Sequence, residues 1–252
     1  MRVIPLHTQR ILPGDDALSV VLEILAKKNL KKNDVICISS KIFALGENRV
    51  IKLSSIKPSS RANTLAHTLH MNPSFVQCVL NEADSVHKGV RGALLTLKNG
   101  IPIANAGIDQ SNTPFGYVVL WPKSPARLAE KVNKAIFKRY KVKTGVIITD
   151  SSFITGRKGT IGIAVAISGF EGVRDEKGKK DLFNKRMQLT SVDVADSLAT
   201  VANIAGGERN EQTPVVLIRD ANITLSSMPS LFLTKQLTIN RSKDLFFACY
   251  YK

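Results

Sequence analysis

The sequence has few cysteines and few acidic residues, and each shortage excludes a class of protein. Only three cysteines occur among 252 residues, without the spacing of a zinc site or of a disulfide framework. They are Cys37, Cys78 and Cys249, and their apolar neighbours predict reduced core residues of a cytoplasmic protein. The 20 Asp and Glu residues are outnumbered by 36 Lys and Arg residues, which gives a net charge of +16. Such an excess attracts polyanions, but the aromatic signature of an RNA-binding module is missing, so we expect no specific nucleic acid partner.

Long hydrophobic runs are also missing. No apolar stretch approaches the roughly 20 residues that cross a bilayer, and the first ten residues, MRVIPLHTQR, lack the apolar core of a signal peptide. We therefore expect no membrane span and a cytoplasmic location. A hydrophobic content of 44% is typical of a folded protein, and 252 residues can form one large domain or two smaller ones.

Three widespread motifs are absent as well. The sequence G-x-x-x-x-G-K-[ST] does not occur, so a P-loop does not hold any nucleotide that the protein binds. The dinucleotide fingerprint G-x-G-x-x-G is missing, and so is the G-x-S-x-G elbow of serine hydrolases. Serine hydrolase chemistry therefore has no support in the sequence.

What is present is the periodicity of a mixed α/β fold. Short β-branched runs predict strands at 3–6, 35–38, 146–148, 160–167 and 214–219, and a hairpin at 93–104. Helical spacing predicts helices at 17–28, 58–70, 73–80, 124–140 and 192–204, the last one capped by Thr190 and Ser191. Residues 172–181 are too polar for a core and predict a charged loop.

Side chains that carry oxygen follow several of these elements. The set consists of Asp109, Asn112, Asp150, Ser151 and Glu208, of which Asp150 comes at the predicted end of the 146–148 strand. Converging carboxylates repel one another unless a cation lies between them, and hard oxygen ligands favour Mg²⁺ or Mn²⁺. A metal site built from these residues is therefore one hypothesis. His67 and His70 are a weaker one, because no third ligand lies near them in sequence.

Cations occur beside the same strand ends. Ser40 and Lys41 follow the 35–38 strand, and Arg157 with Lys158 follows Asp150 in a turn rich in glycine. Their charges suit phosphate, and carboxylates, metal and cations together suit phosphoryl transfer, in which positioning and charge neutralisation supply most of the catalysis. The alternative is that Asp150 belongs to an ordinary turn between two core strands and that Ser40 caps the next turn.

Eight short strings follow one another along the chain. They are ILPGDD (11–16), PSSRA (58–62), NAGIDQSN (105–112), GVIITDSSF (145–153), GRKG (156–159), IAVAISG (163–169), GKKDLF (178–183) and VADSLATVAN (194–203). Together they resemble the coenzyme F420-0:γ-glutamyl ligase family, over residues 3–220 but not over the C-terminal tail. The resemblance implies an enzyme that joins L-glutamate to a deazaflavin precursor, coenzyme F420-0, through a γ-linked amide, with GTP and a divalent metal. Some relatives are thought to extend folate instead.

The resemblance also implies roles for individual residues. Metal binding is implied for Asp109, Asp150, Ser151 and Glu208, with Asp109 and Asp150 taking part in catalysis. Nucleotide contacts are implied for Gln9, Arg10, Ile11, Ser40, Lys41, Asn112, Gly206 and Gly207. The acceptor carboxylate would be activated as an acyl phosphate and then attacked by the glutamate amine. We further expect a mixed α/β homodimer, with a catalytic domain at 1–220 and a C-terminal extension at 221–252 packed on it.

Two departures from the family pattern leave questions open. A lysine of the family string S-K-A-E-G-R is replaced by Leu45, for which Lys41 or Lys52 could substitute. The family loop G-E-G-x-D-G reads GERNEQ at 207–212, which loses glycines but adds Arg209, whose charge suits phosphate. The choices between GTP and ATP and between F420-0 and folate stay open. So does a binding protein that keeps the fold without catalysis, and nucleic-acid binding rests on charge alone.

Overall fold

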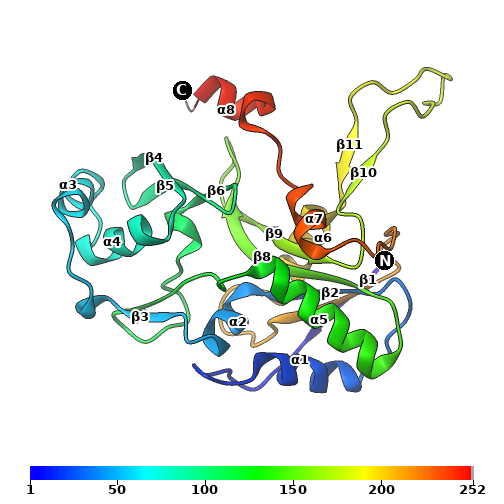
Figure 1. The fold of residues 1–252 in the computed structure, drawn as a ribbon, viewed down its shortest axis with the longest axis horizontal. Helices are drawn as coiled ribbons and strands as arrows, with labels where there is room; N and C mark the ends of the chain where they lie inside the picture. The colour runs from blue at the N-terminus through cyan, green and yellow to red at the C-terminus, as the bar shows by residue number, and fades with distance from the viewer. Residues whose placement is uncertain (251–252) are drawn as a thin grey trace.

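In a computed structural model, the chain forms a five-stranded mixed sheet with helices on both faces and a smaller lobe beside it (Figure 1). The structure describes the backbone of residues 1–250 and the side chains of residues 1–247. The mixed α/β class predicted from the sequence is confirmed. Cys37 and Cys78 are buried and free, as predicted, whereas the side chain of Cys249 lies outside the described residues.

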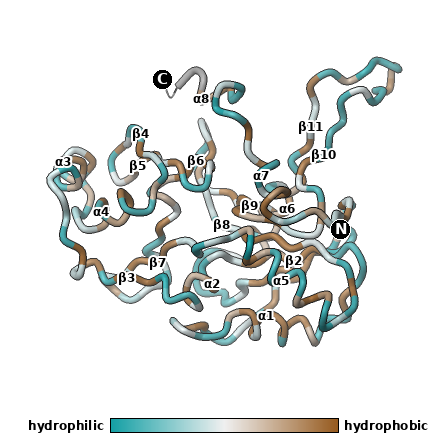
Figure 2. The backbone as a smooth tube through the Cα atoms, in the orientation of Figure 1, coloured by the Kyte–Doolittle hydropathy of each residue, from teal (hydrophilic) through white to brown (hydrophobic). Residues whose placement is uncertain are grey.

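The central sheet has the order β1 (Arg2–Leu6), β12 (Val215–Arg219), β2 (Val35–Ser39), β8 (Gly145–Phe153) and β9 (Thr160–Ser168). Strands β2 and β8 are parallel, and the other neighbours are antiparallel. The central strands are apolar at consecutive positions because both of their faces are covered. Figure 2 shows this concentration of hydrophobic residues along the sheet.

One face of the sheet is covered by α1 (Ala17–Ala26), α2 (Ser40–Gly46) and α5 (Pro125–Tyr140), and the other by α6 (Val194–Gly206) and α7 (Ser230–Lys235). Helix α2 was not predicted. The predicted cap of α6 was wrong, because Ser191–Asp193 forms a strand and Asp193 caps the helix by accepting from Asp196 N. Strand pairing thus competed successfully with helix formation at these residues.

The smaller lobe has its own hydrophobic core. Helices α3 (Ser60–Leu69) and α4 (Pro73–Glu82) pack against a sheet of β4 (Ser85–Val90), β5 (Ala93–Lys98) and β6 (Ile101–Ala104). The last two strands are the hairpin predicted from the sequence. The lobe also contains the pair β3 (Val50–Lys52) and β7 (Tyr117–Val119), together with the short 3₁₀ helices η1 (Leu53–Ser55) and η2 (Asn105–Gly107).

A hairpin projects from the body of the protein in Figure 1, and we call residues 173–193 the arm. Strands β10 (Val173–Asp175) and β11 (Ser191–Asp193) form its base, so the predicted charged loop at 172–181 is a strand in its first part. Three apolar side chains of the arm are almost fully exposed, namely Leu182 at 98%, Phe183 at 82% and Leu189 at 89%. An apolar surface of this kind commonly marks a contact with a partner.

The C-terminal segment packs on the rest of the chain. It contains α7, η3 (Arg241–Lys243) and α8 (Leu245–Tyr250). Leu233 of α7 joins the core beside α6, and the Thr234 hydroxyl accepts a hydrogen bond of 3.1 Å from Ile167 N of β9. Within residues 1–250, no helix combines the length and the apolar character that crossing a membrane requires.

Candidate active site

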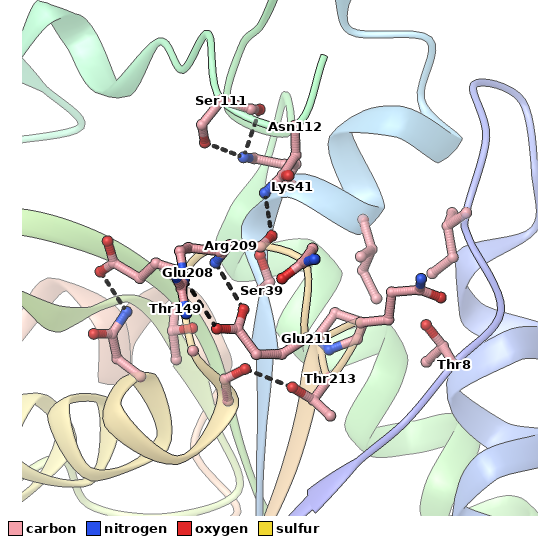
Figure 3. Close-up of a pocket in the computed structure, with 18 of the residues that line it drawn as sticks. Thr8, Ser39, Lys41, Ser111, Asn112, Thr149, Glu208, Arg209, Glu211 and Thr213 are labelled. Atoms are coloured by element: carbon pink, nitrogen blue, oxygen red, sulfur yellow. Dashed lines mark hydrogen bonds and ion pairs between the residues drawn. The ribbon is translucent and has the colours of Figure 1, made fainter.

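A cavity of about 660 Å³ opens at the edge of the central sheet where β2 ends. The carboxyl ends of β1 and β2 and the start of β12 meet at this edge, because β12 runs antiparallel to both of its neighbours. Figure 3 shows side chains from several of these segments pointing toward one another. Twelve predicted site residues line the cavity, namely Gln9, Arg10, Ile11, Lys41, Asp109, Asn112, Asp150, Ser151, Gly206, Gly207, Glu208 and Arg209.

Strand β8 does not end where the sequence suggested. It continues through Thr149 to Phe153, with a register shift against β9 between Ile148 and Thr149. Such a bulge places an extra residue in one strand and redirects the side chains beyond it. The prediction of a strand end was therefore wrong, but Thr149, Asp150 and Ser151 all line the cavity, and their role there stays a prediction.

Two expectations about neighbouring residues need correction. Ser40 is buried as the first residue of α2 and does not line the cavity, whereas Ser39 does. Arg157 and Lys158 lie in the exposed turn between β8 and β9, away from the residues that line it. Leu45 does line the cavity, and Lys41 is the cation beside it. A local glycine pattern does not reveal to which side a turn points.

Asp109 is held by an ion pair and two hydrogen bonds. Lys41 Nζ lies 2.5 Å from Asp109 Oδ2, and the amide and hydroxyl of Ser111 donate to the same carboxylate at 2.6 and 2.8 Å. Burial raises the pKa of Asp109, but Lys41 and Ser111 outweigh that effect, so the pKa lies below its usual value. Asp109 is therefore ionised at neutral pH.

Asp150 lies in a different environment. It is partly buried, its Oδ2 accepts a hydrogen bond from the indole of Trp121, and its Oδ1 accepts one of 2.9 Å from Ser151 N. Burial raises the pKa of Asp150 to about 6, although both hydrogen bonds lower it, and the negative charge of Asp109 raises it further. The two carboxylates are thus close enough to repel each other.

The third carboxylate, Glu208, faces the same cavity from the loop after α6. Its Oε1 accepts from Thr160 Oγ1 at 3.2 Å and from Asn203 Nδ2 at 3.1 Å. Figure 3 shows Glu208 and Lys41 among the side chains that line the cavity. Carboxylates and a hydroxyl are the donors that a hard divalent cation prefers, so the chemistry of the donor set fits Mg²⁺ or Mn²⁺. In the described part of the chain, however, no three His, Cys, Asp or Glu residues are clustered for one ion, His67 and His70 included.

Two loops meet at the cavity. Asn112 Nδ2 donates to Arg209 O at 2.8 Å, which joins the loop after β6 to the loop after α6. The Glu211 carboxylate accepts from Arg209 N at 2.7 Å, and the Arg209 side chain is 87% exposed. Backbone groups thus hold the loop, while the exposed guanidinium, whose Nε lies 3.8 Å from Glu211 Oε1, can approach an anion.

The predicted list of site residues left out several residues of the site. Thr8, Ser39, Thr149 and Glu211 line the cavity, and Trp121 contacts Asp150 from behind it. Ser39 and Thr149 carried a signal, because hydroxyl residues clustered at the predicted ends of two strands. No local pattern connected Trp121 to Asp150, since 29 residues separate them.

Comparison with known proteins gives one consistent result. The family model described as F420-0:Gamma-glutamyl ligase matches residues 5–220. The chain is 40% identical to "Coenzyme F420:L-glutamate ligase" of Methanocaldococcus jannaschii, over 80% of this chain and 81% of that protein. It is 32% identical to the protein of the same name from Methanopyrus kandleri, over 98% of this chain and 97% of that one. The likeness therefore extends into the C-terminal tail, where the sequence had suggested none.

Proposed function

Because the chain belongs to the F420-0:Gamma-glutamyl ligase family, we propose that it joins L-glutamate to coenzyme F420-0 through a γ-linked amide, with GTP as cosubstrate. One observation carries the proposal. Asp109, Asp150 and Lys41 come from three segments that are distant in sequence and line one cavity. A binding protein that had lost catalysis would have little reason to keep two repelling carboxylates beside a cation.

Each charged group has a role in the proposed reaction. Lys41 balances the charge of Asp109 and can approach phosphate oxygens, and the exposed guanidinium of Arg209 can hold the distal phosphates of a nucleotide. Asp109, Asp150, Ser151 and Glu208 are the proposed ligands of Mg²⁺ or Mn²⁺, which would supply positive charge during phosphoryl transfer. Because the three carboxylates are not clustered for one ion in the described residues, they would have to move closer together when the ion binds. The acceptor carboxylate becomes an acyl phosphate, which the amine of glutamate attacks with loss of phosphate.

The acceptor is the finer part of the proposal. The curated relatives carry the name of a coenzyme F420 ligase, which favours F420-0 over folate. The net charge of +16 suits either acceptor, because the substrates of both reactions are anionic. The same charge is the only support for nucleic-acid binding, and the acidic residues in the cavity oppose it.

We also propose that the protein is a homodimer. The support is the arm, which projects from the body and exposes Leu182 and Phe183. Each copy would cover the apolar residues of the other copy's arm. In a C₂ dimer the same surface patch of both copies is buried in one interface.

The test is a ligase assay with L-glutamate, GTP, Mg²⁺ or Mn²⁺, and either F420-0 or folate. We expect release of nucleoside diphosphate that depends on both glutamate and acceptor, an acceptor heavier by one glutamate residue, and no turnover with excess chelator. Asp109→Asn should lose at least about a hundredfold in turnover, as does removal of a charge-stabilising group. Asp220→Asn is the matched control, because Asp220 is exposed and pairs only loosely with Arg2 at 3.8 Å. Absence of product with both acceptors would refute the proposal.

A further inference from the structure

Trp121 is the only tryptophan of the chain, and it is buried behind the cavity with 2% of its surface exposed. It lies two residues after the end of β7, and its indole N–H donates to Asp150 Oδ2. The indole nitrogen is a donor only and does not ionise under ordinary conditions, so the direction of this bond is fixed. Ile103 and Val165 pack around the ring and restrict it.

The backbone of Trp121 is anchored from the smaller lobe. Arg49 Nε donates to Trp121 O at 3.1 Å, and the same guanidinium lies 2.7 Å from Glu82 Oε2. Lys98 Nζ lies 2.9 Å from that oxygen too. Groups on α4 and β5 therefore hold the residue that contacts Asp150, which connects the lobe to the central sheet.

Gly107 packs closely against the indole ring of Trp121. A Cβ at this glycine would overlap Nε1 and Cε2 of the Trp121 indole, and its φ of +70° is one that glycine adopts readily. Gly107 lies two residues before Asp109. The indole is thus in contact both with Asp150 and with the backbone that leads to Asp109.

We propose that Trp121 is a positioning residue, which holds the Asp150 carboxylate in the orientation needed at the cavity. The expected effect on catalysis rests on the proposed function, whereas the contact between Trp121 and Asp150 is independent of it. With Oδ2 bound to the indole and Oδ1 to Ser151 N, the carboxylate has two fixed contacts on its protein side. Loss of one contact lets the side chain rotate, and small displacements of a reacting group reduce turnover strongly.

The first experiment uses Trp121→Phe, which keeps an aromatic ring and removes the N–H. We expect kcat to fall about tenfold or more with little change in the KM for nucleotide, measured well below the melting temperature. Phe170→Leu is the control, because Phe170 is a fully buried aromatic residue in the core beside α6. It should lower the melting temperature while kcat stays within about twofold of wild type. A Trp121→Phe enzyme with wild-type kcat, or an equal loss of kcat in Phe170→Leu, would overturn the proposal.

The second experiment needs no activity and no change at Trp121. As the single tryptophan, Trp121 dominates the intrinsic fluorescence, so its emission reports on the group that its N–H contacts. We expect Asp150→Asn to shift the emission maximum of the metal-free protein, and Glu208→Gln, which does not contact the indole, to leave it unchanged. Identical spectra for wild type and Asp150→Asn would overturn the contact. An inactive wild-type protein with the expected shift would refute the proposed function and leave the contact standing.

Discussion

The substitution Asp150→Asn tests whether Asp150 is a residue of the active site or only a turn residue, because it removes the charge with almost no change in the shape of the side chain. The wild-type carboxyl has a pKa of about 6 in the folded protein against a reference of 3.8. A folded pKa above the unfolded one means that the folded state binds the proton more tightly. Wild-type stability from this group is therefore highest below about pH 4 and is lost as the pH rises through about 6.

The size of the effect follows from these values. A shift of roughly 2 pKa units corresponds to at most about 3 kcal/mol, and partial exposure of Asp150 reduces this to about 2 kcal/mol. Asparagine avoids that loss, but it offers only one oxygen to the two N–H donors of Trp121 and Ser151, which costs about 1 kcal/mol. The variant should therefore be about 1 kcal/mol more stable than wild type at pH 8 and about 0.3 kcal/mol less stable at pH 4.5, where the wild type has already lost part of this stabilisation.

The assay is a pair of thermal melts in chelator at pH 8 and at pH 4.5. For a protein of this size, 1 kcal/mol moves the melting temperature by about 2–4 °C. We expect the variant to melt about 3 °C higher than wild type at pH 8 and about 1 °C lower at pH 4.5. Asp220→Asn is the control, because Asp220 is exposed and does not line the cavity. Glutamate-dependent turnover should fall at least about a hundredfold in Asp150→Asn.

A different pattern would refute the reasoning. If Asp150 is only a turn residue, asparagine should lower the melting temperature by a similar amount at both pH values and leave turnover intact. Intact turnover in an assay where wild type is active would remove Asp150 from the site. If the melting temperatures of variant and wild type differ by the same amount at both pH values, burial does not set the pKa of Asp150.

Two further predictions concern the helix α6 and the arm. Burial and the nearby charge of Asp193 raise the pKa of Asp196 to about 6, so stability from this carboxyl is lost as the pH rises toward that value. Asp196→Asn should therefore melt about 3–6 °C higher than wild type at pH 8 and within about 2 °C of it at pH 4, and a lower melting temperature at pH 8 would contradict this. In the arm, Leu182→Ser with Phe183→Ser should reduce the mass measured by light scattering from a dimer to a monomer, whereas Lys180→Ser should not. A wild-type protein that is monomeric at micromolar concentration would contradict the proposed homodimer.

Much of the fold is visible in local sequence. The runs at 35–38 and 215–218 are apolar at every position because both faces of the central sheet are covered, and this pattern needs no knowledge of the partner strands. The hairpin at 93–104 is likewise local, since its turn, Asn99–Gly100, adopts positive φ at both residues. Twelve of the thirteen predicted site residues line the cavity. Polar groups near strand ends already marked Lys41, Asp109 and Asp150, whereas Gln9, Arg10 and Ile11 were implied only by the family resemblance.

Contacts between distant segments were decided by the tertiary structure alone. Lys41 and Asp109 form their ion pair because the lobe brings the loop after β6 over the end of β2. Strand β8 continues through its polar residues because β9 offers a ladder of hydrogen-bond partners, which outweighs the turn propensity of Asp150 and Ser151. The orientation of Asp150 depends on Trp121, a residue held by the lobe and by Gly107. Sequence patterns indicate which face of a segment is buried and which is exposed to solvent. The direction of an individual side chain depends on neighbours that are distant in sequence and come together only in the folded chain.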